Sequence, residues 1–241
     1  MPFRNTQQAL QLEIDPEVVS RLPILEYNHS IHIIKSLKEA EKAIKLLQKE
    51  PILGFDTESR PAFKKGENYP ISIVQLATEK AAYIFQISLI GSLQPLEPIL
   101  YSHETLKIGI AIRDDLQRLY DLSPINLNGF VELTHLSTQL GIKQTGLRNL
   151  VAILLEKRIC KRAQRSNWSN AFLTRKQLIY AAIDAWACRE IYLNLLTRLQ
   201  HHSLTPSHKK ITFPFTKRSS KQQLKPTVTT PEYPGSDFAI S

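Results

Sequence analysis

The stretch Ile52-Leu-Gly-Phe-Asp-Thr-Glu58 is an apolar run that ends in two carboxylates separated by one residue. Such a run predicts a core strand, and side chains two apart on a strand point to the same face. Asp56 and Glu58 are therefore expected to project together from the end of that strand. Two convergent carboxylates suit a hard divalent cation such as Mg²⁺ or Mn²⁺. Asp-x-Glu also recurs by chance, and at a strand end such acids more often simply meet solvent.

The composition limits the class of protein. With 241 residues, 42% of them hydrophobic, the chain is long enough for one sizeable core. A net charge of +9 favours a polyanionic partner, nucleic acid before an anionic membrane surface. Cys160 and Cys188 lack metal-like spacing, which predicts neither a disulfide framework nor a zinc site. No apolar run approaches the roughly 20 residues of a membrane span, and no secretory signal is evident, so we expect a cytoplasmic protein without membrane contact.

Local signals on both sides of this strand predict a mixed sheet flanked by helices. A capping box, Ser36-Leu-Lys-Glu39, opens a helix that continues to residue 47. Segments 71–77 and 81–86 read as a hairpin, so the acid-bearing strand is expected to have antiparallel neighbours. The remaining expected elements are a helix at 16–22, a strand at 30–34, a helix at 93–101, a strand at 106–110, a helix at 114–120, a strand at 130–133 and a mainly helical segment at 136–200.

The composition also divides the chain into three parts. Residues 1–28 are polar and are predicted to form an N-terminal arm, and residues 29–200 the folded domain. Residues 201–241 are rich in Ser, Thr, Pro and Lys and poor in aliphatic residues, which predicts a flexible basic tail.

A second acidic segment is Lys107-Ile-Gly-Ile-Ala-Ile-Arg-Asp-Asp-Leu116. It predicts a strand that leads into a helix with Asp114 and Asp115 at its start. Acids at this position are also explained by their favourable interaction with the helix dipole.

A third segment opens with another capping box, Thr174-Arg-Lys-Gln177, and places Tyr180 and Asp184 four residues apart on one helical face. Alanines at 181, 182, 185 and 187 would let this helix lie close to a sheet. An amphipathic helix with a polar stripe explains the pattern equally well.

Taken together, the order of these segments resembles the DEDD superfamily of 3′-5′ exonucleases in its tyrosine-containing branch, most closely the ribonuclease D and Werner-type exonuclease domains. The resemblance covers roughly residues 31–199. Further matches lie in Phe55-Asp-Thr-Glu-Ser-Arg-Pro61, Lys107-Ile-Gly109, Ser166-Asn-Trp168 and Tyr180-Ala-Ala-Ile-Asp-Ala185. The resemblance implies a ribonuclease-H-like α/β fold and metal-dependent removal of nucleotides from a 3′ end.

The resemblance also implies residue roles. Asp56, Glu58, Asp115 and Asp184 would be the carboxylates that hold two ions, Mg²⁺ or Mn²⁺, and Tyr180 would position the attacking water. Spacing from Lys107-Ile-Gly109 favours Asp115 over its neighbour Asp114. Because a phenol with a pKa near 10 is a poor base at neutral pH, Tyr180 is assigned to orientation by hydrogen bonding.

A basic run precedes Ser166-Asn-Trp168, and phosphate contacts are its natural use, with a solvated charged face as the alternative. Trp168 is explained equally well as a core residue, and Glu132 is expected to be structural. Many members of the family carry an aromatic residue where this chain has Ser59, so Phe63 and its basic neighbours in the following loop are candidates to contact the strand instead. The run comprises Lys157, Arg158, Lys161, Arg162 and Arg165, and the predicted substrate-binding residues are Arg60, Lys161, Arg165 and Asn167.

The sequence thus predicts a stand-alone 3′-5′ exonuclease acting on a single-stranded 3′ end of DNA or RNA. The alternative is a non-catalytic nucleic-acid-binding module on the same fold, and the presence of all four acids and Tyr180 favours the enzyme. A basic membrane-surface protein would need a basic amphipathic helix with bulky apolar anchors, which the chain lacks.

Overall fold

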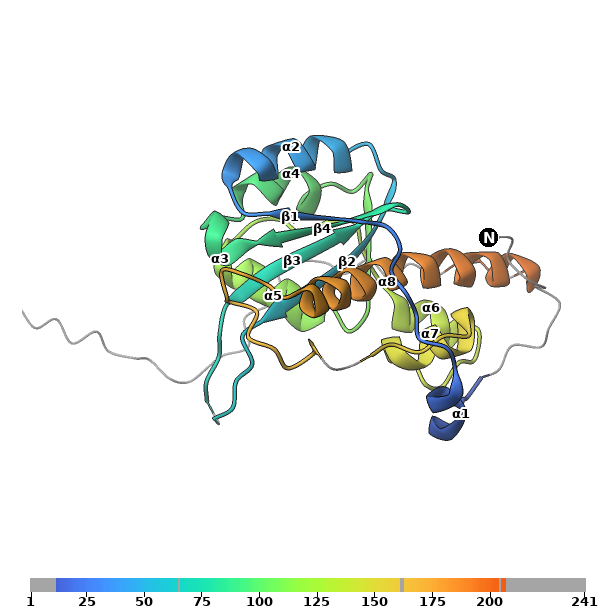
Figure 1. Cartoon of the computed structure of the whole chain (residues 1–241). Helices are drawn as coiled ribbons and strands as arrows, with labels where there is room; N and C mark the ends of the chain where they lie inside the picture. Colours follow the sequence, from blue (N-terminus) through green and yellow to red (C-terminus); the bar gives the residue numbers. More distant parts are fainter. Residues whose placement is uncertain (1–11, 65, 161–162, 204, 207–241) are drawn as a thin grey trace, which may run out of the picture.

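A six-stranded mixed sheet forms the centre of the computed structural model, which describes residues 12–64, 66–160, 163–203 and 205–206 (Figure 1). The strand order is β1-β4-β3-β2-β5-β6, and β3 is antiparallel to both of its neighbours while the other pairs are parallel. The predicted α/β class with a mixed sheet flanked by helices is confirmed. The strands are β1 (Ser30–Ile34), β2 (Ile52–Ser59), β3 (Ile71–Ala77), β4 (Ala81–Gln86), β5 (Leu106–Gly109) and β6 (Phe130–Glu132).

Helices cover both faces of the sheet. The long helix α8 (Arg175–His201) crosses one face in contact with β2, β3, β4 and β5, and α6 (Leu133–Gln139) and α7 (Leu147–Leu155) pack beside it (Figure 1). The opposite face packs against α2 (Leu37–Leu47), α4 (Glu97–Leu100) and α5 (Arg113–Leu122). Two hydrophobic clusters result, one on each side of the sheet.

Small side chains allow α8 to lie close to the sheet, as the alanine pattern predicts. Ala77 and Ala82 on the sheet and Ala182 and Ala185 on α8 form one buried cluster. A Cβ atom at Gly54 of β2 would lie 1.8 Å from the carbonyl oxygen of Ala185, so only glycine fits there. Both predicted capping boxes, at the starts of α2 and α8, are present.

Several predicted boundaries are wrong. Strand β2 continues past the quoted run to Ser59, and only one of its neighbours is antiparallel, because β5 pairs with it in parallel. The helix predicted at 93–101 is a 3₁₀ helix, η1 (Gln94–Leu96), followed by α4. Pro95 and Pro98 each lack an amide hydrogen and fit only the first turn of a helix, so each begins a new short one.

The segment predicted as mainly helical at 136–200 is also interrupted. Helix α7 ends at Leu155, where the next residue, Glu156, has a left-handed φ of 54°, and the described residues between it and α8 form no further α-helix. This irregular connection runs past the end of the sheet that carries the acids.

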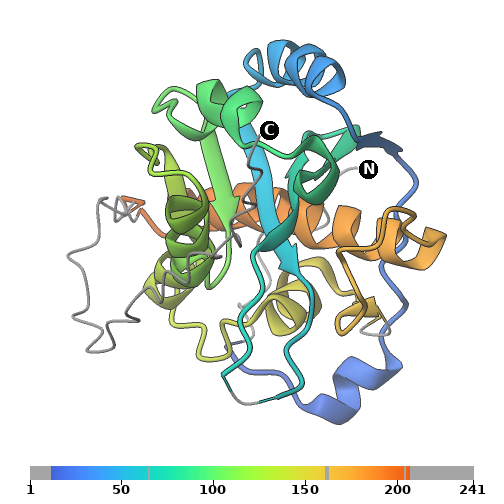
Figure 2. The same cartoon turned by 90° about the vertical axis from the view of Figure 1, so that its left-hand side faces the viewer.

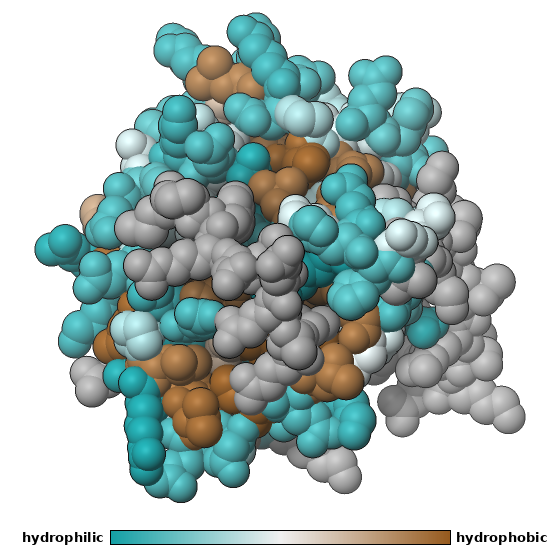
Figure 3. Space-filling view, turned by 90° about the vertical axis from the view of Figure 1, so that its right-hand side faces the viewer, coloured by the Kyte–Doolittle hydropathy of each residue, from teal (hydrophilic) through white to brown (hydrophobic). Residues whose placement is uncertain are grey.

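The N-terminal arm packs on the domain over its described part. Helix α1 (Pro16–Arg21) buries Val19, and Ile14 and Leu25 join the same hydrophobic cluster. At this end of the molecule hydrophilic and hydrophobic side chains are interspersed on the surface (Figure 3). The predicted flexible tail, 201–241, lies outside the described residues except for 201–203 and 205–206. Of the helices in the described part of the chain, none has the length and hydrophobicity that a membrane crossing requires.

Candidate active site

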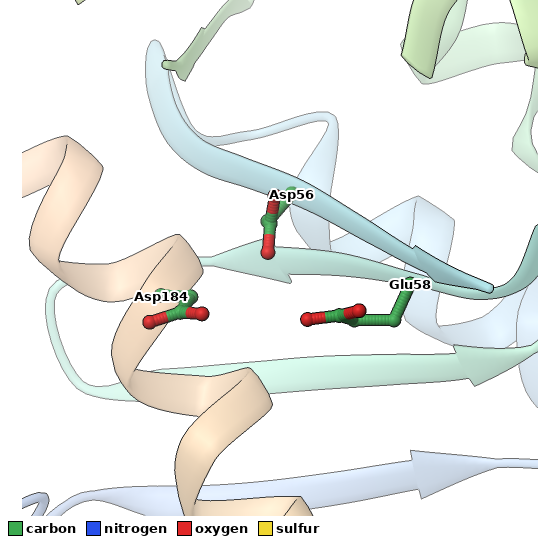
Figure 4. A group of neighbouring side chains, drawn as sticks. All are labelled: Asp56, Glu58 and Asp184. Carbon is green, nitrogen blue, oxygen red and sulfur yellow. The ribbon is translucent and has the colours of Figure 1, made fainter. Parts of the chain in front are cut away.

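Three carboxylates converge between β2 and α8. Asp56 and Glu58 extend from β2 toward Asp184 on α8 (Figure 4). One carboxylate oxygen from each residue lies within 4.8 Å of the other two. The two-residue alternation of β2 puts the first two acids on one face, and the close approach of α8 brings the third to them. A set of oxygen ligands at this separation can hold a hard divalent cation.

The fourth predicted acid, Asp115, lies at the edge of this group. The hydroxyl of Thr57 donates a hydrogen bond of 2.6 Å to its carboxylate. Asp115 is not a member of the 4.8 Å group, but its charge contributes to raising the pKa values of Asp56 and Glu58. Asp114 is exposed to solvent, so the structure turns Asp115, and not its neighbour, toward the other acids.

Burial, together with mutual repulsion at Asp56 and Glu58, raises the pKa values of these carboxyls. Burial, followed by the charges of the neighbouring acids, raises the pKa of Asp56 well above its usual range and the pKa of Glu58 to about 8. Burial raises the pKa of Asp184 to about 7 and that of Asp115 to about 6. A bound cation would reverse this effect, because it favours the charged form of each carboxylate.

Tyr180 lies one helical turn before Asp184, and its phenol is hydrogen-bonded to that carboxylate. Burial, and then the charges of Asp184, Glu58 and Asp56, raise its pKa. The phenol therefore keeps its proton at neutral pH and acts as a donor. Trp168 is fully buried with its ring 6.0 Å from that of Tyr180, so it is a core residue that packs against the tyrosine.

Asp56, Glu58 and Asp184 line a pocket of about 490 Å³. Its other lining residues include Arg148 and Asn149 in the first turn of α7, and Gln164. No side chain caps this helix, so its N-terminus and Arg148 together favour an anion opposite the acids. We did not predict Arg148 from the sequence. The sequence feature that could have identified it is a positive charge in the first turn of a helix. A cation there interacts unfavourably with the helix dipole, which suggests that the residue has a functional role.

Two of the predicted substrate-binding residues stack on aromatic rings. The guanidinium of Arg60 lies 4.7 Å from the ring centroid of Tyr69, and Arg60 lines a different pocket from the acids. The guanidinium of Arg165 lies 5.7 Å from the ring centroid of Phe63, whose side chain is 71% exposed. Arg60, Phe63 and Tyr69 belong to the loop that follows β2, and Arg165 belongs to the connection between α7 and α8.

The other predicted substrate contacts have different outcomes. Asn167 is exposed, and its side-chain oxygen accepts hydrogen bonds from the backbone and hydroxyl of Ser169. Lys161 and Arg162 lie outside the described residues. Nε of Arg158 donates a hydrogen bond to the carbonyl of Leu22. This nitrogen therefore holds the N-terminal arm and does not contact a phosphate.

Glu132 has the structural role that the sequence predicts. Its carboxylate accepts hydrogen bonds of 3.0 Å from the backbone amides of Ala111 and Ile112. Ala111 has a left-handed φ of 54°, which is unfavourable for a residue with a side chain. Glu132 thus stabilises the turn between β5 and α5 that presents Asp115.

Comparisons with known proteins agree with this geometry. The family profile described as 3′-5′ exonuclease matches residues 31–200. The bifunctional 3′-5′ exonuclease/ATP-dependent helicase WRN of Mus musculus is 33% identical over 72% of this chain and 13% of its own length. Ribonuclease D of Gluconacetobacter diazotrophicus is 29% identical over 70% of this chain and 43% of its own length. The chain therefore spans less than half of either relative.

Solved structures show the same fold. The EXO domain of Nibbler from Aedes aegypti superposes with a TM-score of 0.67 at 22% identity, covering 76% of this chain and 95% of that one. Ribonuclease D of Escherichia coli superposes with a TM-score of 0.65 at 19% identity, covering 73% of this chain and 46% of that one. These matches confirm the predicted ribonuclease-H-like fold. With its family profile and its ordered acids, the chain belongs to the 3′-5′ exonuclease family that includes ribonuclease D and the Werner-type exonucleases.

Proposed function

We propose that this chain is a metal-dependent enzyme that hydrolyses phosphodiester bonds from the 3′ end of single-stranded DNA or RNA. The observation that carries the proposal is the convergence of Asp56, Glu58 and Asp184 within 4.8 Å, in a chain of the 3′-5′ exonuclease family. The net charge of +9 supports a polyanionic substrate.

The residues present fit divalent ions. All four acids supply hard oxygen ligands, and burial raises the pKa of each, with repulsion from neighbouring acids adding to the effect at Asp56 and Glu58. Asp56, Glu58 and Asp184 would hold one ion, and Asp115 would take part in holding a second. Bound Mg²⁺ or Mn²⁺ would activate the attacking water and stabilise the charge on the leaving oxygen.

The side chains around the acids would position the reactants. Tyr180 is a hydrogen-bond donor held by Asp184, so we assign it to orienting the attacking water and not to removing a proton. Arg148 and the N-terminus of α7 face the same pocket, where they would bind the phosphate next to the bond that is cut. Holding the phosphate and water in place supplies much of the rate enhancement in such reactions.

A labelled-substrate assay tests this proposal. Linear single-stranded DNA and RNA labelled at the 5′ end should each be incubated with Mg²⁺, Mn²⁺ or EDTA. We expect a descending ladder with at least one substrate in the presence of a metal ion and none in EDTA. Asp56→Asn should reduce the rate by roughly 10³-fold or more, while Asp114→Asn, which changes an exposed acid nearby, should not.

Two results would contradict the proposal. Equal cutting of a circular single strand would show an endonuclease, because a circle has no 3′ end. Binding without cleavage in either metal ion would show a non-catalytic nucleic-acid-binding module on this fold.

A further inference from the structure

A second pocket, of about 520 Å³, lies beyond the end of β2. Both ends of the loop between β2 and β3 line it through Arg60 and Tyr69, and Ser123 lines it from the end of α5. The volume falls within the roughly 300–1,000 Å³ that is typical of ligand pockets. The proposed exonuclease mechanism makes no use of this pocket.

The lining has the chemistry of a nucleobase site. Arg60 stacks on Tyr69 and provides a flat cationic face, and buried Ile71, Ile87 and Leu93 provide apolar surface. The described residues that line the pocket include no acid, in contrast to the pocket of Asp56 and Glu58. Aromatic rings and arginines beside hydrogen-bonding groups bind unpaired bases by stacking. Five serines also line the pocket, at positions 72, 88, 92, 123 and 169.

The two pockets are close to each other. Both lie at the end of β2, but on opposite faces of the sheet: Glu58 lines the acid pocket on the α8 face, and Arg60, two residues later, lines the second pocket together with residues of the α5 face. The connection before α8 also reaches both, because Gln164 lines the first and Ser169 the second. A single strand with its 3′ end at the acids can therefore pass around the end of β2 and place an earlier base in the second pocket.

The loop that joins β2 to β3 adds a further stacking surface. It projects from the end of β2 beyond the body of the sheet (Figure 2). Phe63 on this loop is exposed and lies beside Arg165, as Tyr69 lies beside Arg60. The loop thus presents two aromatic rings, each paired with an arginine.

We propose that the pocket at Arg60, Tyr69 and Ser123 is a subsite for an unpaired base two or more nucleotides upstream of the 3′-terminal nucleotide. This inference rests on the proposed exonuclease function and extends it. The base stacks on the Arg60–Tyr69 pair while the terminal phosphodiester lies at the acids. Substrates long enough to reach both pockets therefore bind more tightly than a dinucleotide.

Two variants that change the pocket in different ways test the subsite. Tyr69→Leu removes the stacking ring, and Ser123→Trp fills the pocket with a large side chain. Tyr101→Leu is the matched control, since Tyr101 is an exposed tyrosine at the end of α4 and does not line the pocket. Fluorescent single strands of two and of twelve nucleotides would be compared by Kd in EDTA and by KM in Mg²⁺, with Tm as the check of folding.

We expect both pocket variants to weaken binding of the twelve-nucleotide strand by about 10-fold, the size of one lost base stack, and to leave dinucleotide binding and the control unchanged. If wild type binds and cleaves the long strand and both pocket variants do so equally well, the subsite is wrong and the exonuclease function stands. Equal weakening for both lengths also overturns the subsite. If wild type neither binds nor cleaves either strand, both proposals are wrong.

Discussion

The two faces of β2 have opposite effects on stability. On the face toward α2 and α5, Leu53 and Phe55 are fully buried in a hydrophobic cluster, and burial of such side chains stabilises a fold by about 1.5–3 kcal/mol each. On the face toward α8, Asp56 and Glu58 crowd against Asp184, and buried like charges cost free energy unless they are protonated or bind a cation. One strand therefore anchors the core on one side and holds a destabilising site on the other.

The largest expected effect comes from a substitution on the hydrophobic face of β2. Phe55→Ala removes a ring that contacts Phe130 edge-on at 5.0 Å between centroids, and we expect a loss of about 3–5 kcal/mol in the free energy of unfolding. Glu58→Gln, on the opposite face of the same strand, should leave the stability of the metal-free protein unchanged or higher. Urea unfolding in EDTA measures both. Similar losses in the two variants would show that the faces do not differ.

A smaller effect is expected from Arg148, which lines the same pocket as the acids. Arg148→Ala should raise the KM for a single-stranded substrate by about 10-fold with little change in Tm, because the proposed charged hydrogen bond from this pocket residue to phosphate would be lost. Lys42→Ala on α2, across the sheet, is the matched control. An unchanged KM for Arg148→Ala would remove this residue from the substrate path.

The pH dependence of stability also distinguishes the acidic face of β2 from its hydrophobic face. In unfolded chains carboxyls ionise near pH 4, whereas burial and repulsion raise the pKa of Glu58 to about 8 and burial that of Asp184 to about 7. Between pH 4 and pH 7 these two carboxyls keep their protons in the folded state but lose them in the unfolded state. The free energy of unfolding in EDTA should therefore fall as the pH rises from 4 to 7. Burial lowers the pKa of Lys107 to about 7, so below that pH Lys107 is protonated in both the folded and the unfolded state and does not change this slope.

Chemical denaturation at several pH values in EDTA checks this slope. Glu58→Gln should flatten it, because one of the groups that retain a proton in the folded state is gone. A free energy of unfolding that rises from pH 4 to pH 7 would contradict the crowded arrangement of the acids.

Local patterns made much of the fold and site predictable. Alternation on β2 predicts that Asp56 and Glu58 share a face, and the helical period predicts the pairing of Tyr180 with Asp184. Both capping boxes and the β3–β4 hairpin are also properties of short stretches. Each of these depends on residues that are close in the sequence.

Features that depend on distant packing could not be predicted in this way. The hydrogen bond from Thr57 to Asp115 joins residues 58 positions apart, and the support of Ala111 by Glu132 joins residues 21 apart. The place of Arg148 opposite the acids follows from the packing of α7 against α8. The parallel pairing of β2 with β5 is also a property of the whole sheet.

The central claim is that the acid face of β2 is a metal site held at a cost in stability, and thermal melts of wild type and Asp184→Asn in EDTA and in Mn²⁺ test it most directly. Asp184→Asn should melt roughly 2–4 °C higher than wild type in EDTA at pH 8, because one of the repelling charges is removed. Wild type should gain more from Mn²⁺, which binds the folded state preferentially. Asp114→Asn controls for loss of an exposed charge. If Asp184→Asn is clearly less stable in EDTA and wild type does not respond to Mn²⁺, Asp184 is a structural hydrogen-bonding residue and the proposed site is wrong.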